Sequence, residues 1–265
     1  FEMPVGEPVE RVEVAGSLCE LGQIPWAERE YRRALDDLPV VSGESLFARR
    51  DWATWLHDRE QYEKAAEVIG EFFDALEEDG PAQRTLMRQL EGRQYLNALN
   101  ARRQFYLACH YESEKEYDRQ REALKKAAAL YDDDPDILIA MYRSPGADEE
   151  FRKETVARVQ AMSQRLLQLI EQYPDEPSFH NQWAWLISNT EGDYQAAVEH
   201  SKRSLELSPE EPSYLDTLAR CYFAAGEVEK AVETQRRAVE LAPHYQVMRR
   251  QLAEFERTLA AKRSQ

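Results

Sequence analysis

The stretch that decides the fold is residues 211–244, which reads EPSYLDTLARCYFAAGEVEKAVETQRRAVELAPH. Gly226 lies near its middle, with a small residue, Ala219, seven positions before it. Two more small residues follow the glycine, Ala231 after five positions and Ala238 after 12. Large apolar residues surround these small ones at helical spacing, so the stretch predicts two helices joined by a turn at the glycine.

Each element of this pattern has a physical role. Glycine can end the first helix because it adopts the left-handed conformation without a steric penalty. Pro243 ends the second helix, since proline lacks the N–H and restricts the residue before it. Alanine on both helices lets the two backbones approach closely, while Leu218 and Tyr222 fill the flanks. The stretch therefore predicts a pair of antiparallel helices.

The same spacing occurs twice more, around Gly22 and Gly192. Small residues stand five and 12 positions after each glycine and a proline stands 17 after it, namely Ala27, Ala34 and Pro39, and Ala197, Ser204 and Pro209. Ala15 precedes Gly22 by seven positions, and Ala184 precedes Gly192 by eight. One spacing that occurs three times predicts an array of similar helix pairs.

This pattern resembles the tetratricopeptide repeat, a helix–turn–helix of about 34 residues, and in particular arrays of the bacterial type. The resemblance implies an all-α fold, a right-handed α-solenoid of antiparallel helix pairs, with residues 1–265 forming a single array. The expected units are residues 8–41, 43–79, 81–134, 135–175 (atypical), 177–210 and 211–244, followed by a C-terminal capping helix at 245–262, about 13 helices in all. Unit 43–79 lacks the glycine and the proline, and unit 81–134 has Gln120 where alanine belongs.

Two stretches depart from the pattern. Residues 81–112 open with Pro81, a favoured first helical residue, and an additional helix here would put the later units out of phase. We therefore expect a single helix of about 30 residues, with Gly92 as the place for any bend. Next we expect a short first helix at 135–143 and a long second helix from about 148 to 173.

Two apolar stripes at helical spacing support the later helices. The long helix carries Val156, Val159, Met162, Leu166, Leu169, Ile170 and Tyr173. The tail at 245–262 carries Val247, Leu252, Phe255 and Leu259 on one side. Because repeat arrays need a terminal helix with a polar outer face, we expect this tail to be the cap.

The composition excludes several classes of partner. The chain has 34 Lys and Arg against 50 Asp and Glu, a net charge of −16, and such a surface repels phosphate. We therefore expect neither nucleic acid nor an anionic membrane as a partner. No apolar run reaches the ~18 residues of a membrane span, so we expect no membrane insertion. The chain begins at Phe1, so an earlier start could have been removed, and the compartment, cytoplasmic or exported, stays open.

No pattern in the chain predicts chemistry. The three cysteines, Cys19, Cys109 and Cys221, have neither metal-site spacing nor the pairing of a disulfide framework. There is no zinc-protease motif, phosphate-binding glycine loop or nucleophile elbow. The five histidines, His57, His110, His180, His200 and His244, lie far apart in sequence, although two could meet across neighbouring helices.

An acidic run at 132–136 lacks the glycine and the distal glutamate of a calcium loop. We interpret it as a turn in which Asp134 or Asp136 caps the next helix. The expectation is therefore no enzyme activity, no metal and no cofactor.

The resemblance implies that the first helices of successive units line a concave groove where partners bind. Helical spacing gives the candidates: Asn181, Trp185 and Asn189; Asp216, Arg220 and Phe223; Phe105 and Tyr106, with Cys109; and Arg50 and His57, with Thr54. Asparagine can donate to and accept from a peptide backbone, and an indole offers apolar area with one donor. In the alternative interpretation, Trp185 packs against a neighbouring helix and the asparagines cap helices or meet water.

We therefore expect a protein–protein interaction scaffold that binds a peptide or protein in this groove. Chaperone-binding members of the family hold a carboxylate with a Lys/Asn/Asn/Lys/Arg clamp. The corresponding places here hold Val12, Gly16, Asp51, Arg102 and Tyr106, and only Arg102 has the required charge, so we expect no such clamp. Two alternatives stay open: a structural subunit that self-assembles, for instance as a homodimer, and the repeat portion of a larger regulatory protein.

Overall fold

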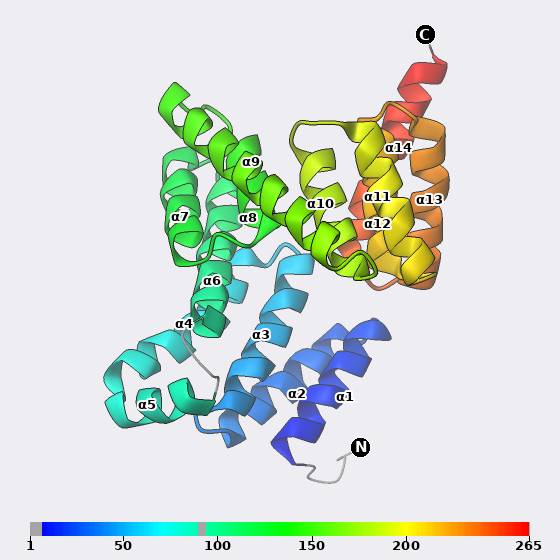
Figure 1. The fold of residues 1–265 in the computed structure, drawn as a ribbon. Helices are drawn as coiled ribbons and strands as arrows, with labels where there is room; N and C mark the ends of the chain where they lie inside the picture. Colours follow the sequence, from blue (N-terminus) through cyan, green and yellow to red (C-terminus); the bar gives the residue numbers. More distant parts are fainter. Residues whose placement is uncertain (1–6, 90–93, 265) are drawn as a thin grey trace. The chain divides into compact units, whose positions relative to one another are not determined.

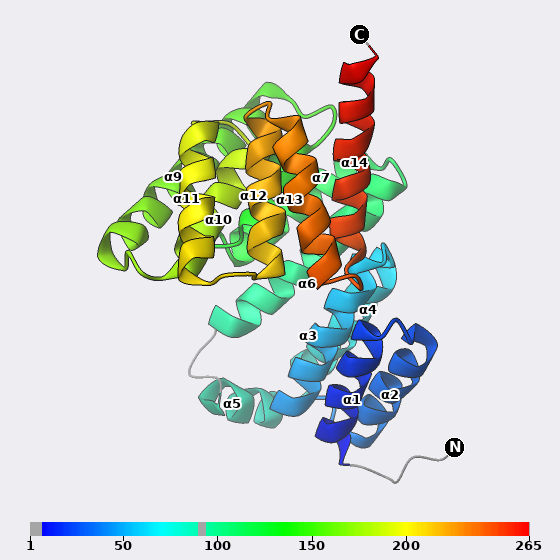
Figure 2. The same cartoon turned by 90° about the vertical axis from the view of Figure 1, so that its right-hand side faces the viewer.

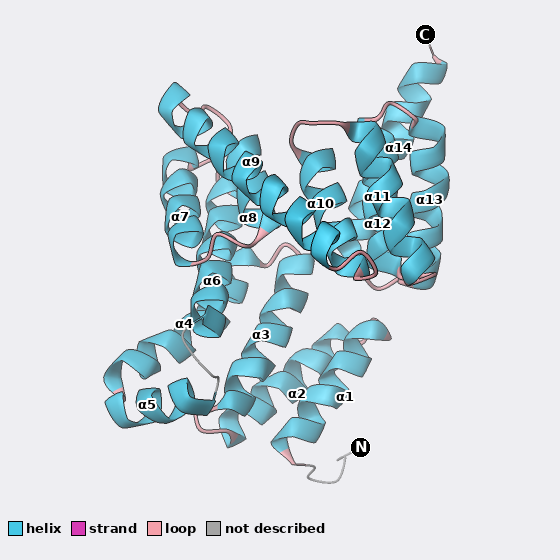
Figure 3. Cartoon of the chain, in the orientation of Figure 1, coloured by secondary structure: helices cyan, strands magenta, loops and turns pink. Residues whose placement is uncertain are grey.

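The computed structural model describes residues 7–89 and 94–264, and the regular elements within these ranges are 14 α-helices (Figures 1 and 3). The all-α prediction is confirmed, with one helix more than expected. The chain divides into two compact units, unit 1 at residues 1–132 and unit 2 at residues 133–265. That residues 1–265 form one continuous array stays a prediction.

Unit 1 contains seven of the helices. They are α1 (Pro8–Glu20), α2 (Ile24–Asp37), α3 (Gly43–Asp58), α4 (Tyr62–Glu78), α5 (Gly80–Gln89), α6 (Gln94–Ser113) and α7 (Tyr117–Leu130). Helix α1 packs against α2, α3 against α4, and α6 against α7, as the repeat requires. Helix α4 also packs against α6.

Unit 2 contains the other seven. They are α8 (Pro135–Arg143), α9 (Glu149–Gln172), α10 (Pro177–Asn189), α11 (Tyr194–Leu207), α12 (Pro212–Ala224), α13 (Val228–Leu241) and α14 (Gln246–Arg263). Helices α10 and α11 form one pair and α12 and α13 the next, with α14 against α13 (Figure 2). The short helix, the long helix and the capping helix all lie where the sequence predicted them.

The small residues of the repeated spacing lie at the helix contacts. At most 1% of the surface of each is exposed: Ala15, Ala27, Ala34, Ala184, Ala197, Ser204, Ala219, Ala231 and Ala238. Five of them, Ala15, Ala27, Ala219, Ala231 and Ala238, belong to core clusters with larger apolar residues packed against them. The packing prediction on which the helix pairs depend is therefore confirmed.

The turns after α1 and α12 share one backbone geometry, whereas Gly192 in the turn after α10 has φ 148°. Gly22 (φ 72°) and Gly226 (φ 83°) adopt the left-handed conformation just after α1 and α12. Beyond each glycine, an N–H reaches back to close the helix end, from Gln23 to the Leu18 carbonyl at 2.8 Å and from Glu227 to the Tyr222 carbonyl at 2.9 Å. This bonding pattern satisfies helix-terminal carbonyls that would otherwise have no partner.

The units without the glycine use the same geometry. Glu60 (φ 60°) and Lys115 (φ 62°) take the left-handed conformation at the corresponding positions after α3 and α6. Gln61 then donates to the Leu56 carbonyl at 2.9 Å, and Glu116 to the Tyr111 carbonyl at 2.8 Å. The helix pair therefore imposes this turn even on residues that carry a Cβ.

The prediction of a single helix over 81–112 is wrong, because two helices, α5 and α6, occupy this stretch. Helix α6 packs against both α4 and α7, whereas α5 packs against α4. Helix α6 thus packs directly between α4 and α7, as the first helix of the next pair, and α5 lies outside the sequence of paired helices. The later helix pairs therefore keep their order of first and second helix. The bend considered at Gly92 lies outside the described residues.

Two members of the apolar stripes are also corrected. Tyr173 is 49% exposed because it lies beyond the end of α9, where the backbone leaves the helical conformation. Val247 is 45% exposed, since the buried face of α14 runs through Met248, Leu252 and Phe255, one position away from it.

Candidate functional site

Helix α10 presents the polar and aromatic strip that the sequence singled out. Pro177 stands in its first turn, and the Glu176 carboxylate caps it by accepting from the Ser178 N–H at 3.3 Å. Trp183, with Ala184 and Ile187, is buried against the neighbouring helices. The adjacent strip of the same helix consists of Asn181, Trp185 and Asn189, which we call the α10 strip.

Trp185 is half-buried and oriented by a hydrogen bond. Its indole N–H donates to the carboxylate of Asp136 on α8 at 2.9 Å. Asp136 in turn belongs to the acidic run at 132–136, in which Asp134 caps α8 by accepting from the Asp136 N–H at 3.0 Å. The capping interpretation of that run is confirmed, and the same run also fixes the position of the indole ring.

Asn189 is buried and its amide is fully engaged. Its side-chain N–H donates to the Trp185 carbonyl at 2.8 Å, and its side-chain oxygen accepts from the Arg143 guanidinium at 2.5 Å. Arg143 also donates to the Asn189 carbonyl at 3.2 Å. Asn189 therefore joins the end of α10 to the end of α8.

Asn181 differs from the other two residues of the α10 strip. It is half-buried, yet its side-chain oxygen is enclosed and has no hydrogen-bond partner among the described residues. An unsatisfied buried acceptor costs about 1–3 kcal/mol. The α10 strip thus carries one polar atom that the fold itself does not satisfy.

The corresponding strip of α12 is enclosed in a polar network. Asp216 accepts from the Gln235 amide at 2.6 Å, and Arg220 donates to Gln251 at 2.9 Å and to Glu254 at 2.9 Å. Burial raises the pKa of Asp216 to about 6, although the Gln235 hydrogen bond and the Arg220 charge act to lower this pKa. These bonds tie α12 to α13 and α14.

Phe223 ends the α12 strip. Its ring stacks on the buried Phe255 of α14, with 4.4 Å between ring centroids. The capping helix therefore packs against the α12 residues that the sequence assigned to a partner.

In unit 1 the candidate residues form an aromatic cluster. Phe105 and Tyr106 are buried on α6, and the ring of His57 on α3 stacks against Tyr106 with 4.8 Å between centroids. Cys109 places its sulfur 3.8 Å from His57 Nε2. Arg50 is exposed; its guanidinium donates to Asp51 at 2.9 Å and to the Tyr95 hydroxyl at 3.0 Å. These contacts join α3 to α6.

Two histidines meet across neighbouring helices, as the sequence allowed. Nδ1 of His180 on α10 lies 2.9 Å from Nδ1 of His200 on α11, and His180 Nε2 lies 3.0 Å from the Pro174 carbonyl. Because a carbonyl can only accept, His180 Nε2 carries a proton, and in the neutral pair His200 Nδ1 donates to His180 Nδ1. Burial, with the neighbouring His180, lowers the pKa of His200, which favours this neutral pair.

Within residues 7–89 and 94–264, no three His, Cys, Asp or Glu side chains are grouped so that they could hold a metal ion. Over the same ranges, no helix is both long and apolar enough to cross a membrane.

Comparison with known sequences places a repeat in unit 2. A family model of the tetratricopeptide repeat matches residues 189–252. The probable biofilm formation methyltransferase WspC of Pseudomonas putida is 36% identical to the chain over 93 residues. That match covers 35% of this chain and 19% of the methyltransferase-named protein, so the chain spans only a small part of that relative.

Solved structures of repeat proteins are also similar to the chain. TTC0263, a thermophilic TPR protein of Thermus thermophilus, is 17% identical with a TM-score of 0.47, over 78% of this chain and 96% of that one. The Cut9–Hcn1 hetero-tetramer of APC/C gives 15% identity and a TM-score of 0.45, over 94% and 43%. YrrB, described as a TPR protein with an unusual peptide-binding site, gives 14% and 0.33, over 82% and 95%.

The family match lies on α11 to α14, where the paired helices meet through the buried small residues that the repeat requires. Residues 189–252 are therefore a tetratricopeptide-repeat segment of the chain.

Proposed function

We propose that this protein is an interaction scaffold that holds an extended peptide segment of a protein partner against the α10 strip. The tetratricopeptide fold supports a protein–protein interaction scaffold in general. The place on the chain and the form of the partner are the specific parts of the proposal.

The observation that carries the proposal is the side-chain oxygen of Asn181. This oxygen has no partner within the described part of the chain, whereas Asn189, two turns further along α10, has both its side-chain oxygen and its side-chain N–H engaged. A half-turn about the last torsion of Asn181 exchanges its oxygen and its amino group, which are assigned only through their hydrogen bonds. The oxygen would then stand where the amino group stood and could accept an N–H from an extended peptide.

Trp185 supplies the apolar part of this site. It lies one helical turn from Asn181, and it is half-buried, with its N–H bonded to Asp136. The ring position is therefore fixed before a partner arrives, so binding would lose little side-chain freedom. Tryptophan is also among the residue types that contribute most when they are buried at interfaces.

We infer further that the chain acts as a binding module and not as an enzyme. The tetratricopeptide family and fold are generally non-catalytic, and the family match at residues 189–252 is to a repeat. The resemblance to the methyltransferase-named protein extends over 93 residues, which is 19% of that protein.

The test starts with a phage-displayed library of random 12-residue peptides selected on the wild-type protein. For one group of the peptides obtained, Asn181→Ala and Trp185→Ala should each raise Kd at least tenfold, about 1.4 kcal/mol. The melting temperature of Asn181→Ala should stay within a few degrees of wild type, because the enclosed oxygen contributes no hydrogen bond to the fold.

Asn100→Ala is the matched control. Asn100 lies on α6 in unit 1, and its side-chain oxygen is likewise buried without a partner among the described residues. Removing it should leave peptide affinity unchanged. The proposal is contradicted if every selected peptide binds both α10 variants within twofold of wild type, or if sedimentation analysis shows a dimer that Trp185→Ala dissociates.

A further inference from the structure

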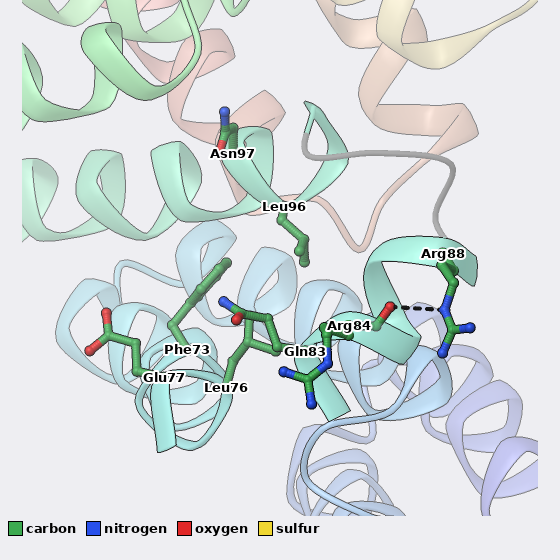
Figure 4. A pocket seen from close by; sticks show the side chains of 8 residues that line it. All are labelled: Phe73, Leu76, Glu77, Gln83, Arg84, Arg88, Leu96 and Asn97. Atoms are coloured by element: carbon green, nitrogen blue, oxygen red, sulfur yellow. Dashed lines mark hydrogen bonds between the residues drawn. The ribbon is translucent and has the colours of Figure 1, made fainter. Parts of the chain in front are cut away.

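Helices α4, α5 and α6 enclose a pocket of about 870 Å³ within unit 1 (Figure 4). Its lining residues are Phe73, Leu76 and Glu77 from α4, Gln83, Arg84 and Arg88 from α5, and Leu96 and Asn97 from α6. Phe73, Leu76 and Leu96 are each at least nine-tenths buried and form an apolar floor. The polar side chains are exposed and form the rim.

The pocket exists because of a helix that the repeat does not require. Helix α5 begins at Gly80, and Asp79 caps its first turn by accepting from the Ala82 N–H at 2.9 Å. It follows α4 in the sequence and packs against it, and α4 also packs against α6. The extra helix therefore adds a third wall to a surface that would otherwise be open.

The rim of this wall carries two arginines one helical turn apart. Arg88 Nε donates to the Arg84 carbonyl at 3.3 Å, and both side chains come from α5, on the same side of the pocket (Figure 4). Neither guanidinium forms an ion pair with any residue that the structure describes, whereas Arg32 and Arg119 are paired with glutamates of nearby turns. The rim of this pocket therefore carries two positive charges, although the chain has a net charge of −16.

We propose that this pocket binds an acidic peptide segment of a protein partner, with an apolar side chain on the floor and a neighbouring carboxylate on Arg84 and Arg88. A carboxylate accepts two parallel N–H bonds from a guanidinium, and the partly enclosed setting strengthens such charged bonds. The floor of Phe73, Leu76 and Leu96 accounts for the apolar neighbour.

The charges around the pocket favour a peptide over a nucleic acid. Glu77 lies on the rim opposite Arg84 and Arg88 (Figure 4), and Glu78 and Asp79 follow it in the sequence. A nucleic acid presents a phosphate at every nucleotide and needs several cations along its path, so this rim would repel the phosphates beyond the first. A peptide with a single carboxylate meets no such repulsion.

This inference goes beyond the α10 proposal, because its residues all lie in unit 1 and those of the α10 strip all lie in unit 2. The two can therefore be tested with separate variants. The probe is the same phage-displayed library, with each selected peptide then titrated by fluorescence anisotropy.

Selection on wild type should enrich peptides in which Asp or Glu neighbours Phe, Leu or Met. For these peptides, Arg84→Gln with Arg88→Gln should raise Kd at least tenfold, and Arg84→Lys with Arg88→Lys should recover part of the loss. Raising the salt concentration from about 50 to about 500 mM should weaken wild-type binding several-fold by screening. Selection on Arg84→Glu with Arg88→Glu should instead enrich Lys and Arg.

Arg152→Gln with Lys153→Gln is the matched control, since it removes two exposed positive charges from α9 in unit 2. It should leave Kd unchanged. The inference is overturned if no acidic bias is enriched, or if the enriched peptides bind the Gln double variant as tightly as wild type. If binding of every peptide depends on Asn181 and not on Arg84 and Arg88, this pocket is not a peptide site and the α10 proposal stands. If binding depends on Arg84 and Arg88 and not on Asn181, the pocket is a peptide site and the α10 proposal fails.

Discussion

Replacing Lys115 by glycine should stabilise the protein, although it removes a whole side chain. Lys115 is exposed and holds φ at 62° in the turn after α6. It donates its N–H to the Glu112 carbonyl at 3.0 Å, and Glu116 donates to the Tyr111 carbonyl at 2.8 Å. These are the bonds that Gly22 and its neighbour make after α1, at 3.0 and 2.8 Å. Glycine should therefore fit without any shift of the backbone.

The magnitude follows from two opposing effects. Holding a residue with a Cβ in the left-handed conformation costs about 1–2 kcal/mol, which the glycine variant recovers. Glycine also gives the unfolded chain more freedom, which takes back about 0.5–1 kcal/mol. The expected net gain in the free energy of unfolding is about 0.5–1 kcal/mol.

Urea unfolding followed by circular dichroism measures this gain as a rise in the transition midpoint. Gly226→Ala is the reciprocal control, because Gly226 has φ 83° and a Cβ there would meet nothing within 4 Å. It should lose about 1 kcal/mol through backbone strain alone. The account of these turns fails if Lys115→Gly lowers the midpoint, or if Gly226→Ala leaves it unchanged.

Three further predictions test the packing, the polar network and the cysteines. Ala231→Leu should cost about 1–3 kcal/mol in urea unfolding, because Ala231 is fully buried where α12 meets α13 and a larger side chain would force the helices apart; an unchanged midpoint would show that the contact is looser than described. Burial raises the pKa of Asp216 from 3.8 to about 6, so between these pH values the folded state binds more protons than the unfolded state. The contribution of this carboxyl to the free energy of unfolding should therefore fall by up to about 3 kcal/mol as pH rises from about 4 to about 6. Unfolding of Asp216→Asn across this pH range should lack that part of the slope, and an identical slope in the variant would contradict the assignment. Iodoacetamide at about pH 8 should alkylate the half-buried Cys109 before Cys19 and Cys221, since burial raises the pKa of Cys19 to about 11 and that of Cys221 to about 12; peptide mass spectrometry over time gives the order, and earlier labelling of Cys221 would refute it.

The helix pairs could be predicted from the sequence because their determinants are local. The spacing from Ala219 through Gly226 to Ala238 specifies two helices, the turn between them and the faces that meet. The left-handed turn at Lys115 has no such signal, because the residue type does not favour that conformation and the packed helices impose it. Helix α5 could not be predicted as a separate helix for a related reason. It packs beside α4, and the hydrophobic periodicity of the sequence does not indicate this contact.

The candidate site was predictable in part. Periodicity placed Asn181 and Trp185 on one strip of α10, adjacent to the buried Trp183. It could not show that Trp185 donates to Asp136, a residue 49 positions away, or that Arg220 donates to Glu254, 34 positions away. Such contacts depend on how helices far apart in sequence pack together. The Arg84 and Arg88 pocket was likewise hidden, because it requires α5 to be a separate helix.

The most direct test of the α10 proposal is the response of the Trp185 indole to a bound peptide. The chain has five tryptophans, so a nitrogen-15 correlation spectrum should contain five indole N–H signals, and Trp185→Phe assigns the one of interest. Titration with a peptide whose binding requires Asn181 should shift the Trp185 signal and leave those of Trp52 and Trp55 in unit 1 in place. A saturated complex in which the Trp185 signal has not moved would contradict binding at this strip.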